Sequence, residues 1–150
     1  MVEVRKHFPD IAHWAESIYG VEAVLNLGDS TISSSAGVHQ GDPLASLLFA
    51  LALLPVVENI VRAVPNLKQN TWFLDDGALG GEKADLQLAI DILKQQGPER
   101  GLHLNAEKSM VWCPGHDQGD DDPLERGIPR VRKGGVKLLG SPVGRQLFER

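Results

Sequence analysis

Cysteines, glycine-rich phosphate loops and serine-hydrolase motifs are scarce or missing in this sequence, and each absence argues against a class of protein. The lone Cys113 cannot form an internal disulfide, which argues for a reducing compartment or for indifference to redox conditions. We expect Cys113 to be a half-buried strand residue and not a catalytic thiol. Neither a Gly-x-Gly-x-x-Gly fingerprint nor a phosphate-binding lysine loop occurs, so the common nucleotide-binding folds are not indicated. The serine run 33–35 lacks a Gly-x-Ser-x-Gly elbow, so a serine hydrolase is not supported.

Secretory and membrane features are missing as well. The first residues show no signal-peptide pattern. The longest apolar run, residues 47–57, is too short to span a bilayer and contains Pro55. Because this run is apolar around its whole circumference, it is predicted to be a buried core helix. An intracellular protein without a membrane partner is expected.

An overall basic charge is also absent. The net charge is −5, whereas proteins that hold nucleic acid normally present cations to its phosphates. Part of the acidic excess lies in residues 114–130, which are expected to form a flexible loop. A basic stretch overlaps the end of this loop and either contacts a nucleic-acid backbone or forms a solvated face. Its members are Arg126, Arg130, Arg132, Lys133 and Lys137.

The hydrophobic periodicity predicts helices that alternate with hairpins in a single domain over residues 1–150. The expected helices are 8–19, 43–64 with a kink at Pro55, and 84–96. The expected strands are 21–27, 30–35, 70–74, 78–80, 110–113 and 136–139. This order indicates an α+β fold, with helices packed on one face of an antiparallel sheet.

Two adjacent acids, Asp75 and Asp76, lie between short apolar runs and precede Gly77. An Asp-Gly pair between strand-like residues is a strong hairpin signal, which predicts a turn at residues 75–77. Neighbouring carboxylates repel each other, and a divalent cation relieves that repulsion. The pair therefore suggests a metal site for phosphate chemistry, and the alternative is a solvated acidic turn.

A second segment, residues 37–44, reads GVHQGDPL and runs into the predicted helix 43–64. Taken with the acidic hairpin, it resembles the reverse transcriptase family, particularly enzymes of non-long-terminal-repeat retrotransposons and group II introns. In that family a Gln-Gly-Asp-Pro-Leu segment opens a helix, and paired aspartates follow an aromatic and a small residue on a hairpin. Residues 101–109 and 136–140 resemble two further family segments in the expected order.

The resemblance implies an RNA-directed DNA polymerase that adds a deoxynucleotide to a primer 3′ hydroxyl, with an RNA template and a DNA primer as partners. Two Mg²⁺ ions would serve as cofactors, with Asp75 as the primary metal ligand and Asp76 as the secondary one.

The remaining site residues also follow from the resemblance. Gln40 and Gly41 would face the incoming nucleotide or the template, and Lys108 would neutralise or protonate the leaving pyrophosphate. Leu139 and Gly140 would form the turn that positions the primer end.

The resemblance covers nearly the whole chain but only part of a polymerase palm. The first catalytic strand, with a further metal-binding aspartate, and the fingers are expected before residue 1, and the thumb after residue 150. The isolated chain is therefore predicted to be inactive.

Three alternatives stay open. One is a non-catalytic remnant that docks to nucleic acid or protein, and another is an unrelated α+β binding module. The third is a metal centre at His116, Asp117 and Asp120.

Overall fold

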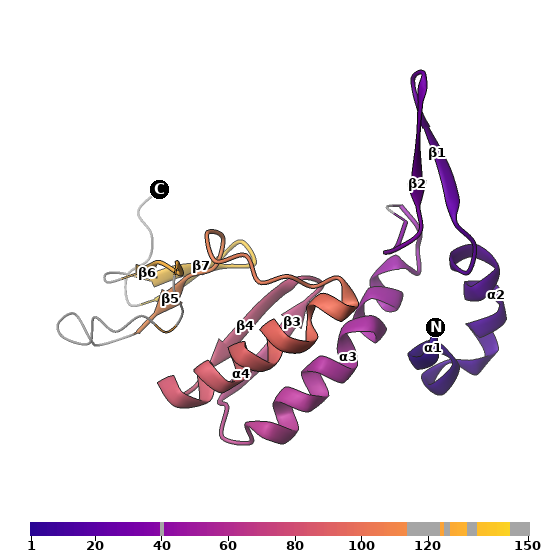
Figure 1. Cartoon of the computed structure of the whole chain (residues 1–150). Coiled ribbons are helices and arrows are strands. Elements are labelled where there is room, and N and C mark those ends of the chain that lie inside the picture. The colour runs from indigo at the N-terminus through magenta and orange to yellow at the C-terminus, as the bar shows by residue number, and fades with distance from the viewer. Residues whose placement is uncertain (40, 114–123, 125–126, 132–134, 145–150) are drawn as a thin grey trace. The chain divides into compact units, whose positions relative to one another are not determined.

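The computed structural model describes residues 1–39, 41–113, 124, 127–131 and 135–144 (Figure 1). The helices are α1 (Val2–His7), α2 (Pro9–Tyr19), α3 (Ala45–Ala63) and α4 (Lys83–Gln96), with a short 3-10 turn, η1 (Pro98–Arg100). The strands are β1 (Ala23–Leu27), β2 (Ser30–Ser34), β3 (Gln69–Phe73), β4 (Asp76–Gly80), β5 (Val111–Trp112), β6 (Arg130–Val131), β7 (Gly135–Leu138) and β8 (Ser141–Gly144).

The α+β class predicted from the sequence is confirmed, but the strands do not form one sheet. In the part of the chain that the structure describes, they pair as four two-stranded ladders, β1–β2, β3–β4, β5–β6 and β7–β8. The β5–β6 ladder is parallel and the other three are antiparallel. Each antiparallel ladder is a hairpin with a two-residue connection, so local turn chemistry specifies it. The single antiparallel sheet expected from the sequence is replaced by these separate ladders.

The chain divides into two compact units, residues 1–55 and 56–150, and the division falls inside α3. In the first unit, α1 and α2 pack on the start of α3 around a small apolar core of Val4, Ala12, Ala15, Leu48 and Leu51. Pro9 occupies the first turn of α2, where its missing N–H costs nothing. An ion pair between Arg5 and Glu16 joins α1 to α2.

Helix α3 confirms the helix expected over residues 43–64, but it is not buried around its whole circumference. Its buried residues are Leu48, Leu51, Leu53, Val56 and Ile60, whereas Val61 is 57% exposed. Packing covers one side of this apolar helix and leaves the other open. By length and composition alone α3 could cross a membrane, although core helices of soluble proteins pass the same test.

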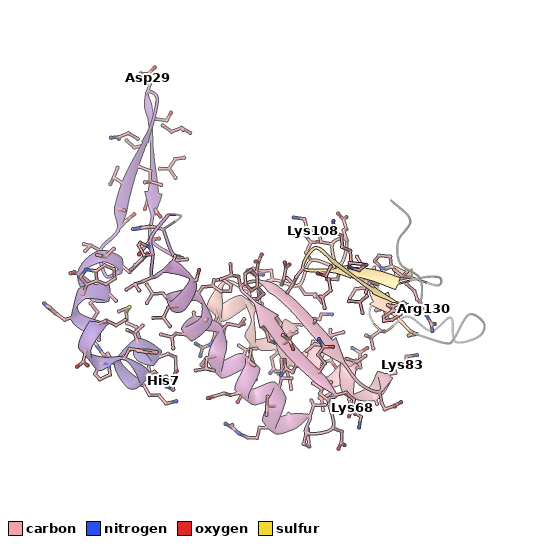
Figure 2. The ribbon with its side chains drawn as sticks, turned by 180° about the vertical axis from the view of Figure 1, so that it is seen from behind. His7, Asp29, Lys68, Lys83, Lys108 and Arg130 are labelled. Carbon is pink, nitrogen blue, oxygen red and sulfur yellow. The ribbon has the colours of Figure 1, made fainter. Side chains whose placement is uncertain are left out.

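In the second unit, α4 lies on one face of the β3–β4 hairpin, as opposite views show (Figures 1 and 2). The Asn59 amide on α3 donates a 2.8 Å hydrogen bond to the Gln96 carbonyl oxygen at the end of α4, so these two helices are in contact. The buried hydrophobic residues among those described in this unit are Val56, Ile60, Val64, Ala89, Ile90 and Leu93. The β3–β4 hairpin therefore has one face that packs on α4, the supported face, and an opposite face that this helix does not cover, the open face.

Candidate active site

The paired aspartates lie at the tip of the β3–β4 hairpin. The ladder ends with Phe73 opposite Asp76, and Leu74 and Asp75 form the two-residue turn. The hairpin predicted from the sequence is therefore present, but its turn is at residues 74–75 and not at 75–77. Asp76 is the first residue of β4, and Gly77 follows it inside the strand.

Gly77 serves close packing and not the turn. It is absent from the described residues with positive φ, so its freedom of backbone conformation is not used. A Cβ atom at Gly77 would lie 2.5 Å from Cζ3 of the Trp72 ring, which covers it from the opposite strand. The Trp72 indole N–H donates a 2.7 Å hydrogen bond to Asn70 Oδ1, which fixes the ring over the glycine. This packing explains why the Asp-Gly pair did not form the turn.

The two faces of the hairpin differ in exposure. Residues that pair directly share a face, and successive residues alternate between faces. Trp72 and Asn70 lie on one face and are half-buried. Phe73 and its partner Asp76 lie on the other, where Phe73 is 61% exposed. The face that carries Asp76 is therefore open to a ligand.

The Asp75 and Asp76 carboxylates fit a divalent cation by their chemistry and surroundings. Both residues are exposed, and within the described residues neither side chain forms a hydrogen bond or an ion pair. Ionised carboxylates only accept hydrogen bonds and are the hard oxygen ligands that Mg²⁺ prefers. Among the described residues, no group of three or more His, Cys, Asp or Glu side chains could hold a metal ion.

Two leucines have strained backbone conformations, and each lies at the tip of a predicted functional hairpin. Leu74 has φ 55° and Leu139 has φ 48°, and they are the described non-glycine residues with positive φ. This region costs roughly 1–2 kcal/mol for a residue with a Cβ atom. Residues in such conformations persist where the surrounding structure holds them, and they cluster at functional sites.

Leu139 and Gly140 form the two-residue turn between β7 and β8. Both have positive φ, 48° and 86°, which is typical of a type I′ turn. The sequence correctly predicted a Leu-Gly turn after a short strand. It missed β8, because Ser141 and Pro142 are poor strand formers that pair here at an edge.

Gly41 lies in a tight turn before α3, with φ 91°, as expected for a position that needs glycine. The Asp42 N–H donates a 3.2 Å hydrogen bond to the His39 carbonyl and closes the turn. Asp42 Oδ1 accepts a 2.8 Å bond from the Leu44 N–H, and Oδ2 accepts the Tyr19 hydroxyl proton. Gln40, the other residue predicted to bind nucleotide or template, lies outside the described residues.

The Tyr19–Asp42 bond changes the ionisation of both groups. Burial of the Tyr19 ring, followed by the hydrogen bond to Asp42, raises the pKa of Tyr19 above 10.0. The same bond, followed by that from the Leu44 N–H, lowers the pKa of Asp42 below 3.8. No local sequence pattern predicts this contact, because the two residues are 23 positions apart.

Lys108 lies in the same compact unit as Asp75 and Asp76. Asn105 shapes the turn that carries it, because Oδ1 of Asn105 accepts a 3.1 Å bond from the Lys108 N–H. The Lys108 side chain is exposed at the surface (Figure 2), and its ammonium group has no ion pair with a described residue. It is available to an anionic ligand.

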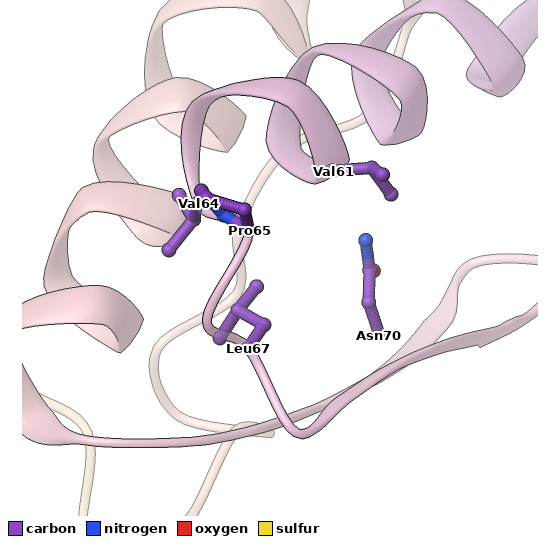
Figure 3. Close-up of a pocket in the computed structure, with 5 residues that line it drawn as sticks. All are labelled: Val61, Val64, Pro65, Leu67 and Asn70. Atoms are coloured by element: carbon purple, nitrogen blue, oxygen red, sulfur yellow. The ribbon is translucent and has the colours of Figure 1, made fainter.

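A small cavity lies on the supported face of the hairpin and not at the aspartates (Figure 3). Its volume is about 200 Å³, and it is lined by Val61, Val64, Pro65, Leu67 and Asn70. The Asn70 Nδ2 atom is buried and has no hydrogen-bond partner among the described residues. This space is smaller than usual ligand sites of about 300–1,000 Å³.

Other predicted features lie largely outside the described residues. They include most of the acidic loop, the alternative metal ligands His116, Asp117 and Asp120, and the basic residues Arg126, Arg132 and Lys133. Arg130 is half-buried in β6, and Lys137 is exposed in β7. Cys113 is half-buried as predicted, but it directly follows β5 and is not part of that strand.

Carboxylates are the hard oxygen ligands of the metal ions that assist phosphoryl transfer. The chain belongs to the reverse transcriptase (RNA-dependent DNA polymerase) family, whose model matches residues 3–143. Neither the curated proteins nor the solved structures contain a match. The reverse transcriptase family predicted from the sequence is thereby confirmed. Members of this family generally use divalent metals and bind a template and a primer.

Proposed function

We propose that this chain contributes the metal-binding hairpin of an RNA-directed DNA polymerase of the non-long-terminal-repeat retrotransposon or group II intron type. Asp75 and Asp76 bind Mg²⁺ at the tip of β3–β4, and the chain forms part of the polymerase palm. The observation that carries the proposal is the exposed carboxylate pair without a hydrogen-bonding or ionic partner among the described residues. The strained Leu74 beside the pair supports it.

Each site residue has a distinct role in nucleotide addition. Asp75 and Asp76 hold the metal ions, which stabilise the charge on the attacking and leaving oxygens when bound. Lys108 neutralises the leaving pyrophosphate through its exposed ammonium group. Gln40 and Gly41 face the incoming nucleotide or the template, and the Leu139–Gly140 turn positions the primer end.

We also propose that the 150-residue chain does not polymerise on its own. Two-metal phosphoryl transfer needs ligands that surround both ions, and Asp75 and Asp76 are two carboxylates. The described residues hold no group of three metal-binding side chains. A further carboxylate from a strand outside this sequence, as the family resemblance implies, would complete the site.

A non-catalytic role is the second candidate, and the same incomplete ligand set favours it. A remnant of this kind would bind template and primer, or dock to protein, without nucleotide addition. The net charge of −5 makes strong autonomous binding to nucleic acid harder.

Primer extension and primer–template binding, measured on the same protein, test the proposal. We expect no extension of a DNA primer on an RNA template. Fluorescence anisotropy should show weak binding that strengthens with Mg²⁺, and Asp75→Ala should remove that Mg²⁺ dependence. Asp29→Asn is the matched control, because Asp29 also lies in a two-residue hairpin turn (Figure 2) but has no acidic neighbour.

The outcomes separate the parts of the proposal. Extension that depends on Asp75 would refute the predicted inactivity while supporting the metal site. Primer–template binding that does not depend on Mg²⁺ would refute the metal role of the aspartates. An equal change of the Mg²⁺ dependence in Asp29→Asn and Asp75→Ala would refute it as well.

A further inference from the structure

The Tyr19 hydroxyl contacts both ends of the segment 39–42. Tyr19 is the last residue of α2, and its O–H donates to Asp42 Oδ2. The same oxygen accepts a 3.3 Å hydrogen bond from the backbone N–H of His39. The Tyr19 hydroxyl therefore donates one hydrogen bond to Asp42 and accepts another from His39. These two residues flank positions 40 and 41.

Asp42 links the Tyr19 hydroxyl to the start of α3. Its second carboxylate oxygen accepts the Leu44 N–H at 2.8 Å, and its carbonyl accepts the Ala45 N–H at 3.0 Å. Asp42 thus caps the helix with one oxygen and holds Tyr19 with the other. A capping carboxylate with both oxygens engaged has little freedom to rotate.

His39 is held in two further ways. Its ring lies against the Tyr19 ring, with centroids 4.7 Å apart and an interplanar angle of 35°. Its carbonyl accepts the Asp42 N–H at 3.2 Å, which closes the turn that contains Gly41. Because Gly41 has φ 91° and no side chain, the contacts of its neighbours hold this part of the backbone.

We propose that Tyr19 is a positioning residue that fixes the 39–42 turn in the conformation that presents Gly41 to the nucleotide or template. The proposal rests on the function proposed above. The hydroxyl is not needed to pack α2 on α3, because the apolar core of the first unit already joins these helices and the Tyr19 ring packs against it. Tyr19→Phe keeps that ring and removes both hydrogen bonds of the hydroxyl.

Amide hydrogen exchange on the whole chain is the first test. Tyr19→Phe is expected to speed exchange at His39 and also at Asp42 by roughly five- to tenfold, the scale of one lost net hydrogen bond. Exchange at Leu48, whose N–H bonds to Leu44 inside α3, should stay unchanged. Ser17→Ala is the matched control, since the exposed Ser17 hydroxyl bonds only to the Trp14 carbonyl of the same helix.

Binding of a DNA primer on an RNA template, with Mg²⁺ present, is the second test. If the turn adopts its competent conformation about a tenth as often, apparent affinity falls about tenfold. Tyr19→Phe should therefore weaken binding by a factor similar to its effect on Asp42 exchange, while Ser17→Ala changes neither quantity.

Each result has a defined meaning. Faster exchange at His39 alone would refute the proposal, because the hydroxyl would then protect one amide without holding the turn. Faster exchange at Asp42 with unchanged binding would also refute it. Faster exchange at both His39 and Asp42 in Tyr19→Phe, combined with a wild-type chain that binds no nucleic acid, would refute the proposed function and leave only the conformational role of Tyr19.

Discussion

The Trp72 ring lies directly over Gly77 of the opposite strand, so close that a Cβ atom at position 77 would come within 2.5 Å of it. This pair sets the register of the hairpin that carries Asp75 and Asp76. It thereby decides that Asp76 begins β4 and that Asp75 stays in the turn.

Gly77→Ala should destabilise the chain by about 1–3 kcal/mol, because the added methyl group displaces the indole from its packed position. Urea unfolding followed by tryptophan fluorescence and circular dichroism measures the loss. The matched background is Trp72→Leu, in which the same alanine should cost far less. Equal costs in both backgrounds would mean that the ring and the glycine do not interact energetically.

Leu74→Asn should stabilise the hairpin by about 1 kcal/mol, since asparagine tolerates positive φ better than leucine does. Thermal unfolding gives the change in stability. Leu88→Asn is the control, because Leu88 is 45% exposed, against 40% for Leu74, and lies in α4 without backbone strain. A destabilised Leu74→Asn variant would show that the side chain, and not the backbone conformation, dominates at this tip.

Acid should weaken the chain partly through Asp42. A carboxyl whose folded-state pKa lies below 3.8 adds stability above that pH and loses it as the pH falls through the lowered pKa. Urea unfolding between neutral and strongly acidic pH should therefore show a smaller acid loss in Asp42→Asn than in the wild type. Tyr19→Phe removes the first cause of the shift and should reduce the loss in the same direction. If both variants lose as much stability in acid as the wild type does, the result would contradict a stabilising bond between Tyr19 and Asp42.

The sequence predicted most elements because their signals are local. The apolar stripe after Pro43 predicted helix α3, and the helix-breaking pair Gly97-Pro98 predicted the end of α4. Helix α1 was missed, because VEVRKH alternates apolar and charged residues and has no helical apolar face. The Asp-Gly rule misplaced the turn, since cross-strand packing of Trp72 overrode it.

The candidate site was predictable as a set of residue types but not as a set of contacts. Asp75, Asp76, Lys108, Gly41 and Leu139 follow from ordered motifs along the chain. The bond from Tyr19 to Asp42 depends on how α2 packs beside the start of α3, which no local pattern encodes. The positive φ of Leu74 likewise contradicts its residue type, and only the folded hairpin reveals it.

Binding of Mn²⁺ as a paramagnetic substitute for Mg²⁺ tests the central claim most directly. Nuclear magnetic resonance spectra of the wild-type chain should show selective broadening of the amides of residues 74–77. The double variant Asp75→Asn/Asp76→Asn should abolish that broadening, and Asp29→Asn should leave it intact. Broadening that persists in the double variant, or that centres on other acidic residues, would contradict a metal site at the hairpin tip.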